Sequence, residues 1–166
     1  LDLDELQIQK TADATIAAWD KYTSLDPEAK DVLSVLRRTR TIGLISNYDH
    51  PPHVYLLLSK LGLAALFDVV VVSGEGGVAK PDPRIFELAI QQTKLRPREV
   101  VYVGDTSDDV HGALDAGLCP ILIRREGAAT EREIGDYNVD QQPGERVAVD
   151  GVETISKLSD LVEMFR

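Results

Sequence analysis

The sequence predicts an α/β protein whose parallel sheet is doubly wound, with helices covering both faces. Two observations predict this class. Four short apolar runs, each rich in β-branched residues, alternate with longer amphipathic segments, and this alternation favours βαβ units with right-handed crossovers. The apolar runs are also continuous, without a polar residue at every second position, which is typical of strands buried on both faces.

The N-terminal elements are predicted from capping residues and helical periodicity. Residues 1–24 carry apolar residues at spacings of three and four, which predicts a helix. Asp26 and Pro27 provide an N-cap and a first helical residue for a second helix. The first strand is predicted at residues 42–45, and an amphipathic helix follows at residues 52–61, before a glycine.

The next elements continue the same alternation. The strand at residues 69–72 leads to a helix that begins at Asp82 and Pro83, again an N-cap and a first helical residue. The strand at residues 100–103 leads to a helix over residues 107–116, which also ends before a glycine.

The C-terminal part is less regular. A fourth strand is predicted at residues 121–123. Residues 125–145 contain Gly, Asp, Asn, Gln and Pro without periodicity and are predicted to form a loop. Residues 146–149 are predicted as a last edge strand, and Ser159 as the cap of a final helix.

Composition excludes several classes of function. The chain has 166 residues, 43% of them hydrophobic, so a single soluble domain is expected. The net charge of −10 argues against binding to nucleic acid or anionic lipid. No apolar run approaches the roughly 20 residues that span a bilayer. We therefore expect no nucleic-acid or membrane partner, and the single cysteine, Cys119, fits a reducing, cytoplasmic location.

Polar residues follow the predicted strands, at the edge where open parallel sheets bind ligands. Ser46 and Asn47 come after the first strand, Lys80 after the second, and Asp105 and Asp109 after the third. A hydroxyl and backbone N–H groups at Ser46 and Asn47 suit phosphate oxygens, and Lys80 supplies a compact positive charge. Asp105 and Asp109 lie four residues apart around a helix start and can face one point, which suits Mg²⁺. Each of these residues alone is common in turns or at the start of helices. Their occurrence together, in this order and after successive strands, makes the pattern specific for a phosphate and metal site.

The stretch that carries these residues resembles the core of the haloacid dehalogenase superfamily. "LISN" ends at Asn47, "KPDPRIF" begins at Lys80, and "VGDTSDDVHGALDAG" contains Asp105 and Asp109; they resemble the second, third and fourth motifs of that family, in order. The resemblance implies a Rossmann-like fold and Mg²⁺-dependent hydrolysis of a small phosphorylated molecule through an aspartyl-phosphate. By this match Ser46 and Asn47 bind the phosphoryl group, and Lys80 steadies phosphate and nucleophile. Asp105 and Asp109 bind the metal.

The first motif of the family, an apolar strand ending in Asp-x-Asp that carries the nucleophile, is missing. The Asp-x-Asp at residues 2–4 follows no strand. In the family this strand lies centrally, between the strands that carry the second and fourth motifs. We therefore expect that Leu1 is not the natural start and that the nucleophilic Asp lies upstream. Residues 1–26 are then the remnant of a helical cap, and residues 27–166 form the core without its first strand.

Other functions remain open at this point. The same superfamily contains 2-haloacid dehalogenases, which work without a metal, and phosphosugar mutases; the pair of Asp105 and Asp109 favours a phosphatase. A non-catalytic binding module would explain the missing first motif, but not the joint presence of Ser46, Lys80 and Asp105. The substrate and the oligomeric state are not specified by the sequence.

Overall fold

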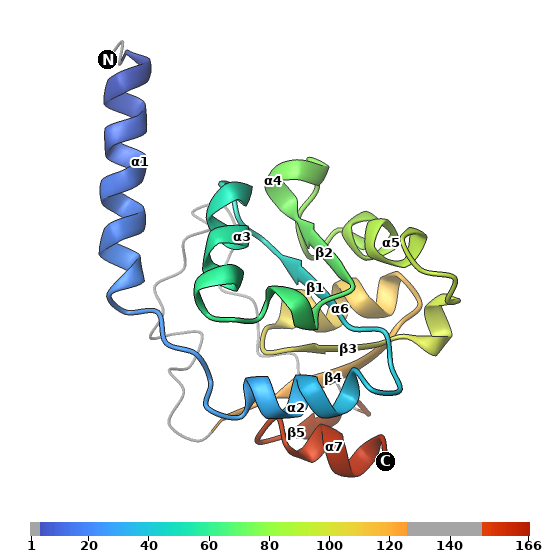
Figure 1. Cartoon of the computed structure of the whole chain (residues 1–166). Helices are drawn as coiled ribbons and strands as arrows, with labels where there is room; N and C mark the ends of the chain where they lie inside the picture. Colours follow the sequence, from blue (N-terminus) through green and yellow to red (C-terminus); the bar gives the residue numbers. More distant parts are fainter. Residues whose placement is uncertain (1–3, 126–150) are drawn as a thin grey trace.

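The computed structural model describes residues 4–125 and 151–166 (Figure 1). The elements of the first half are α1 (Glu5–Asp20), α2 (Ala29–Leu36), β1 (Gly43–Ser46), α3 (Pro51–Lys60), the 3₁₀ helix η1 (Ala64–Leu66), β2 (Val69–Val72) and α4 (Ser73–Gly76). Those of the second half are α5 (Pro83–Gln91), the 3₁₀ helix η2 (Pro97–Glu99), β3 (Val101–Gly104), α6 (Ser107–Asp115), β4 (Cys119–Ile123), β5 (Glu153–Ile155) and α7 (Asp160–Met164). Strands and helices alternate through the core as predicted.

Two helix starts differ from the prediction in their local chemistry. The second helix begins at Ala29 rather than Pro27, because the Asp26 carboxylate accepts the N–H of Glu28 at 2.9 Å and closes a turn before the helix. Ser159 precedes α7 as predicted, but its hydroxyl donates to Glu28 Oε1 at 2.8 Å and does not cap its own helix. This hydrogen bond joins the start of α2 to the start of α7.

The described strands form two parallel sheets. β1 pairs with β2, and β3, β4 and β5 pair in that order. β5 was not predicted; the edge strand expected at residues 146–149, and residues 126–145 of the expected loop, lie outside the described residues. Within the described ranges, β1 and β3 are not hydrogen-bonded to each other, so each keeps one unpaired edge.

The unpaired edges leave β1 and β3 more exposed than the apolar sequence predicts. Every residue of β1 is at least partly exposed, and Val101 of β3 is 39% exposed. Val72 of β2 is completely buried by contrast. The prediction of strands buried on both faces therefore holds for β2 and does not hold for β1.

Helices cover both faces of the sheets. α5 and α6 pack against strands of both sheets on one face, around the fully buried side chains of Ile85 and Phe86. On the other face, α3 packs against β1 and β2, and α2 and α7 pack against β3, β4 and β5. This arrangement confirms the α/β class with parallel strands.

The N-terminal helix α1 extends away from the sheets (Figure 1). Asp4 caps it, because its carboxylate accepts the N–H of Gln7 at 2.8 Å while the Gln7 side chain accepts the N–H of Asp4 at 3.0 Å. Leu6 and Ile8 are both more than half exposed. None of the helices in the described ranges is both long and apolar enough to cross a bilayer.

Candidate active site

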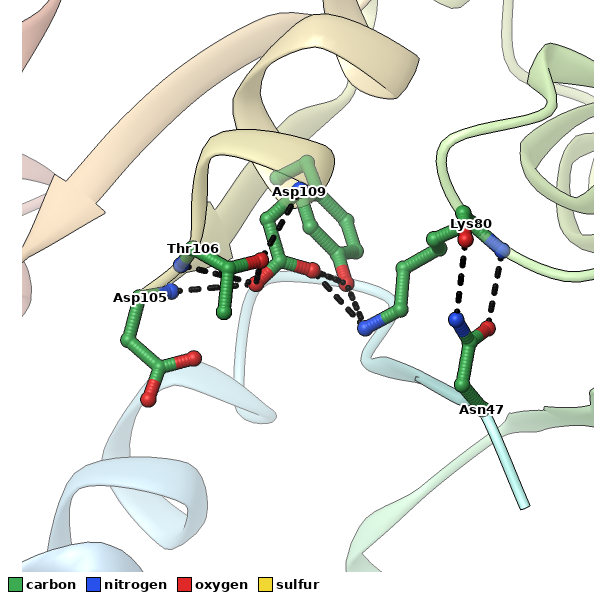
Figure 2. Close-up of polar contacts among 6 residues, drawn as sticks. Asn47, Lys80, Asp105, Thr106 and Asp109 are labelled. Atoms are coloured by element: carbon green, nitrogen blue, oxygen red, sulfur yellow. Dashed lines mark hydrogen bonds and ion pairs between the residues drawn. The ribbon is translucent and has the colours of Figure 1, made fainter. Parts of the chain in front are cut away.

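The turn after β1 is attached to Lys80 through the side chain of Asn47 (Figure 2). Asn47 Nδ2 donates to the Lys80 carbonyl at 3.0 Å, and Asn47 Oδ1 accepts the Lys80 N–H at 2.8 Å. Ser46, the last residue of β1, is thereby placed beside the loop that carries Lys80. Among the described residues the Ser46 hydroxyl has no hydrogen-bond partner, so it is available to a ligand.

A second contact fixes the same turn from the end of β2. Ser73 Oγ accepts the N–H of Tyr48 at 2.9 Å and donates to the Tyr48 carbonyl at 3.3 Å. Gly74 lies so close to this turn that a Cβ would come within 2.9 Å of the Tyr48 carbonyl oxygen. Glycine is therefore required at this position for the close approach of the two loops.

The Lys80 side chain ends beside Asp109 of α6 (Figure 2), and it also contacts Tyr102 of β3, so that the three side chains form a cluster. Lys80 Nζ donates to Asp109 Oδ1 at 2.7 Å and to the Tyr102 hydroxyl at 3.2 Å. The Tyr102 hydroxyl donates to the same Asp109 oxygen at 2.9 Å. The side chains of Lys80 and Asp109 are only 15% and 4% exposed, so removal of either charge would leave the other buried without its partner.

Asp109 is also bonded to the start of its own helix. Its Oδ2 accepts the N–H groups of Asp105 and Thr106, each at 3.1 Å, and the Thr106 hydroxyl at 2.8 Å. Thr106 Oγ1 accepts the Asp109 N–H at 3.1 Å, which completes a capping box at the start of α6. Gly104 is needed beside this box because a Cβ there would overlap the Asp109 side chain. Both carboxylate oxygens of Asp109 are thus occupied by protein donors.

Burial and charge fix the protonation states in this cluster. Burial alone would raise the pKa of Asp109, but the Lys80 charge and hydrogen bonds from Lys80, Thr106 and Tyr102 hold that pKa below its usual range. Burial, followed by the charge of Asp109, raises the pKa of Tyr102. At neutral pH Asp109 is therefore a carboxylate and Tyr102 a protonated phenol.

Asp105 is exposed, and its carboxylate extends away from that of Asp109 (Figure 2). Within the described part of the chain this carboxylate has no hydrogen-bond partner. No three His, Cys, Asp or Glu side chains in residues 4–125 and 151–166 form a group that could hold a metal ion. The free oxygens of Asp105 fit a hard cation such as Mg²⁺, whereas Asp109 would first have to release one of its donors.

Within the described ranges, hydrogen bonds join three of the five predicted site residues directly, and the side chains of the other two form none. Asn47, Lys80 and Asp109 are linked by hydrogen bonds, and Ser46 and Asp105 flank them in the chain. Their functional roles stay predictions. The sequence did not predict the contacts made by Ser73, Gly74, Tyr102 and Thr106. Two of these residues carry a signal that could have identified them as site residues. Tyr102 has a hydroxyl in an otherwise apolar strand, and Ser73 directly follows an apolar strand.

A family model and many known proteins are similar to this chain. A model described as haloacid dehalogenase-like hydrolase matches residues 2–117. The ribulose-1,5-bisphosphate 5-phosphatase of Halopiger xanaduensis is 32% identical over 154 residues, 90% of this chain and 62% of that protein. The crystal structure of a haloacid dehalogenase (HAD) phosphatase from Thermococcus onnurineus has a TM-score of 0.65 at 28% identity, over 85% of this chain and 58% of the other. The crystal structure of a 2-haloacid dehalogenase from Pseudomonas syringae pv. Tomato DC3000 has a TM-score of 0.63 at 30% identity, over 84% of this chain and 52% of the other.

The chain spans between 52% and 62% of the length of these three proteins. The matched segment contains the turn after β1, the Lys80 loop and the start of α6, which together build the candidate site. Because the family model matches well over half of the chain and the parallel α/β fold agrees with it, the chain belongs to the haloacid dehalogenase-like hydrolase family.

Proposed function

We propose that this chain carries most of the catalytic domain of a Mg²⁺-dependent phosphatase that hydrolyses a small phosphorylated molecule through an aspartyl-phosphate. The observation that carries the proposal is the Lys80 ammonium, fixed 2.7 Å from Asp109 at the carboxyl ends of the strands. A fixed cation at this edge of a parallel sheet suits an anionic substrate. The phosphatase activity named for the Halopiger xanaduensis protein supports the same substrate class.

Each site residue has a proposed role in binding the phosphoryl group. The Ser46 hydroxyl and the backbone N–H groups of Ser46 and Asn47 bind its oxygens. Lys80 offsets the charge of the phosphate and of the nucleophilic carboxylate. The Asn47 side chain supports this role because it holds the Lys80 main chain by two hydrogen bonds.

Asp105 and Asp109 are the residues proposed to hold Mg²⁺. Asp105 offers a free carboxylate, and binding by Asp109 requires exchange of one of the donors on its oxygens. When bound, Mg²⁺ would act as a Lewis acid on the phosphoryl oxygens and offset the negative charge of the site. The protein contributes the positions of the two carboxylates and of the Lys80 ammonium.

The nucleophilic Asp and the general acid/base are proposed to lie upstream of Leu1, on a strand between β1 and β3. The unpaired edges of these strands support this, because a strand between them would complete both hydrogen-bond ladders. Its carboxyl end would then adjoin Ser46 and Asp105. In the same proposal residues 1–26 are the end of a helical cap.

The exposed thiol of Cys119 supports a reducing, cytoplasmic location.

A 2-haloacid dehalogenase is the second candidate, because such an enzyme from Pseudomonas syringae shares the fold at 30% identity. That reaction releases a halide from carbon and needs no phosphate-binding hydroxyl or metal. The two candidates are separated by incubating the complete gene product with a 2-haloacid and with a phosphate ester. Halide release without phosphatase activity would replace the first proposal by the second.

The phosphatase proposal is tested by hydrolysis of p-nitrophenyl phosphate by the complete gene product, with and without Mg²⁺. We expect hydrolysis that requires Mg²⁺ and falls by about 100-fold or more in Asp105→Asn, because that change removes a charged metal ligand. The matched control is Asp108→Asn, three residues along the chain on α6, which should retain nearly full activity. Equal turnover by Asp105→Asn and the unaltered protein would refute the metal assignment.

A further inference from the structure

Tyr102 lies between the structural core and the candidate site. Its ring packs edge-on against that of Phe86, with 4.8 Å between centroids and an interplanar angle of 82°. Phe86 is itself completely buried, and Gly112 leaves room for it, because a Cβ there would come within 2.6 Å of the Phe86 ring. The position of the Tyr102 hydroxyl is therefore set by a fully buried and closely packed part of the core.

The donors and acceptors of the cluster can be assigned without ambiguity. The ionised Asp109 carboxylate only accepts, so the hydrogen bond of 2.9 Å between it and Tyr102 uses the phenol proton. The phenol oxygen is then an acceptor for Lys80, whose ammonium carries three N–H groups and no acceptor. One N–H points to Asp109 and a second to Tyr102.

These two bonds fix the direction of the third N–H of Lys80. Rotation about the Cε–Nζ bond would break both hydrogen bonds, so two acceptors hold the three protons of the ammonium in place more firmly than one acceptor does. Within the described residues, no hydrogen bond to another acceptor is formed by Lys80 Nζ. The third N–H is therefore available to an anion, in a direction that depends on both Asp109 and Tyr102.

We propose that Tyr102 is a positioning residue, which orients the Lys80 ammonium so that its remaining N–H meets the anionic group bound at the site. The inference rests on the proposed phosphatase function for the identity of that anion. Tyr102 does not touch the substrate; it acts through Lys80. Hydrogen bonds between a charged donor and a fixed acceptor are strong and directional. Loss of the Tyr102 hydroxyl therefore leaves the charge of Lys80 in place but makes the orientation of its ammonium less defined.

The test uses Tyr102→Phe in the complete protein, because this change keeps the ring against Phe86 and removes only the hydroxyl. The first readout is the NMR signal of the Lys80 ammonium, identified by its disappearance in Lys80→Met. We expect a slowly exchanging signal in the unaltered protein and its loss or broadening in Tyr102→Phe. The second readout is hydrolysis of p-nitrophenyl phosphate, for which we expect kcat/KM to fall by about tenfold, mainly through kcat.

Tyr55→Phe is the matched control, because the Tyr55 hydroxyl donates to Glu75 at 2.9 Å and the change removes a similar hydrogen bond away from Lys80. It should leave both readouts unaltered. Absence of a Lys80 signal in the unaltered protein, an unchanged signal in Tyr102→Phe, or unchanged kcat/KM in an active enzyme would each overturn the inference. If the unaltered protein hydrolyses no phosphate ester, the phosphatase proposal fails, and the ammonium signal alone decides the role of Tyr102.

Discussion

Asn47 uses both ends of its side-chain amide on the main chain of one distant residue. The acceptor and the donor of Asn47 match the N–H and the carbonyl of Lys80, 33 residues away in the chain. These two hydrogen bonds resemble those between neighbouring β-strands, and they hold the loop after β2 against the end of β1. The position of the Lys80 side chain therefore depends on Asn47, although Asn47 does not contact its ammonium.

Replacement of Asn47 by alanine tests this dependence. We expect Asn47→Ala to lower the free energy of unfolding by about 1 kcal/mol, because two exposed hydrogen bonds are lost. The kcat/KM for p-nitrophenyl phosphate should also fall. The fall should be larger than that in a variant that loses a similar amount of stability away from the site. Gln92→Ala serves as the control, because Gln92 Nε2 donates to the Leu88 carbonyl on the surface of α5 at 3.2 Å, away from the site. Equal kcat/KM in the two variants would contradict the positioning role.

The sequence predicted which residues gather at the site better than it predicted how they are bonded. Ser46, Asn47, Lys80, Asp105 and Asp109 follow strand ends, and strand ends are recognisable from local patterns. Their partners are set by the tertiary fold: Lys80 reaches Tyr102 and Asp109 over 22 and 29 residues. No local pattern specifies such pairs. Neither the role of Tyr102 in the cluster nor the occupation of both Asp109 oxygens was therefore predictable from the sequence.

At the scale of elements, Asp68 links three segments of the fold. Its Oδ2 accepts the N–H of Ile42, just before β1, at 3.0 Å, and its Oδ1 accepts from Arg37, just after α2, at 2.8 Å. Asp68 itself lies directly before β2. The backbone hydrogen bond from Ile42, followed by the hydrogen bond and charge of Arg37, lowers the pKa of Asp68.

The lowered pKa predicts how Asp68 stabilises the fold as a function of pH. The folded-state pKa lies below the unfolded value of about 3.9, so the stabilisation is present above that value and is lost as pH falls towards the folded-state pKa. Asp68→Asn should therefore lower the free energy of unfolding at pH 7, and the difference from the unaltered protein should shrink as pH falls below about 4. Urea unfolding between pH 7 and pH 3 measures this. Asp31→Asn on α2 is the control, and a difference for Asp68→Asn that does not vary with pH would contradict the prediction.

Local signals placed most elements but not all of their ends. Asp82 caps α5 as predicted, because its carboxylate accepts the N–H of Arg84 at 2.9 Å. Asp26 offers the same residue pattern, yet its carboxylate closes a turn and the helix begins at Ala29. β5 has only three residues, and pairing with β4 rather than periodicity defines it as a strand. Elements with strong local signals were thus predictable, and elements made by tertiary pairing were not.

At the scale of the whole molecule, the strands of the described residues fall into two sheets, which separates them from an ordinary doubly wound sheet. α5 and α6 span both sheets and bury a common core, so the sheets are held together by side chains and not by a hydrogen-bond ladder between β1 and β3. Unpaired strand edges expose N–H and carbonyl groups that pair readily with another strand. The resemblance to the haloacid dehalogenase superfamily predicts such a gap, because the strand of the first motif lies in that family between the strands that carry the second and fourth motifs.

Hydrogen exchange can show whether a strand of the complete protein fills this gap. In the chain Leu1–Arg166, amides on the unpaired edges of β1 and β3 should exchange much faster than those of β4, which is paired on both sides. In the complete gene product the same amides of β1 and β3 should become protected, because an upstream strand would accept their hydrogen bonds. The β4 amides should be protected in both proteins and provide the internal control. Protection of β1 and β3 that is the same in both proteins would show that no upstream strand pairs there, and the nucleophile would then have to be sought elsewhere in the protein.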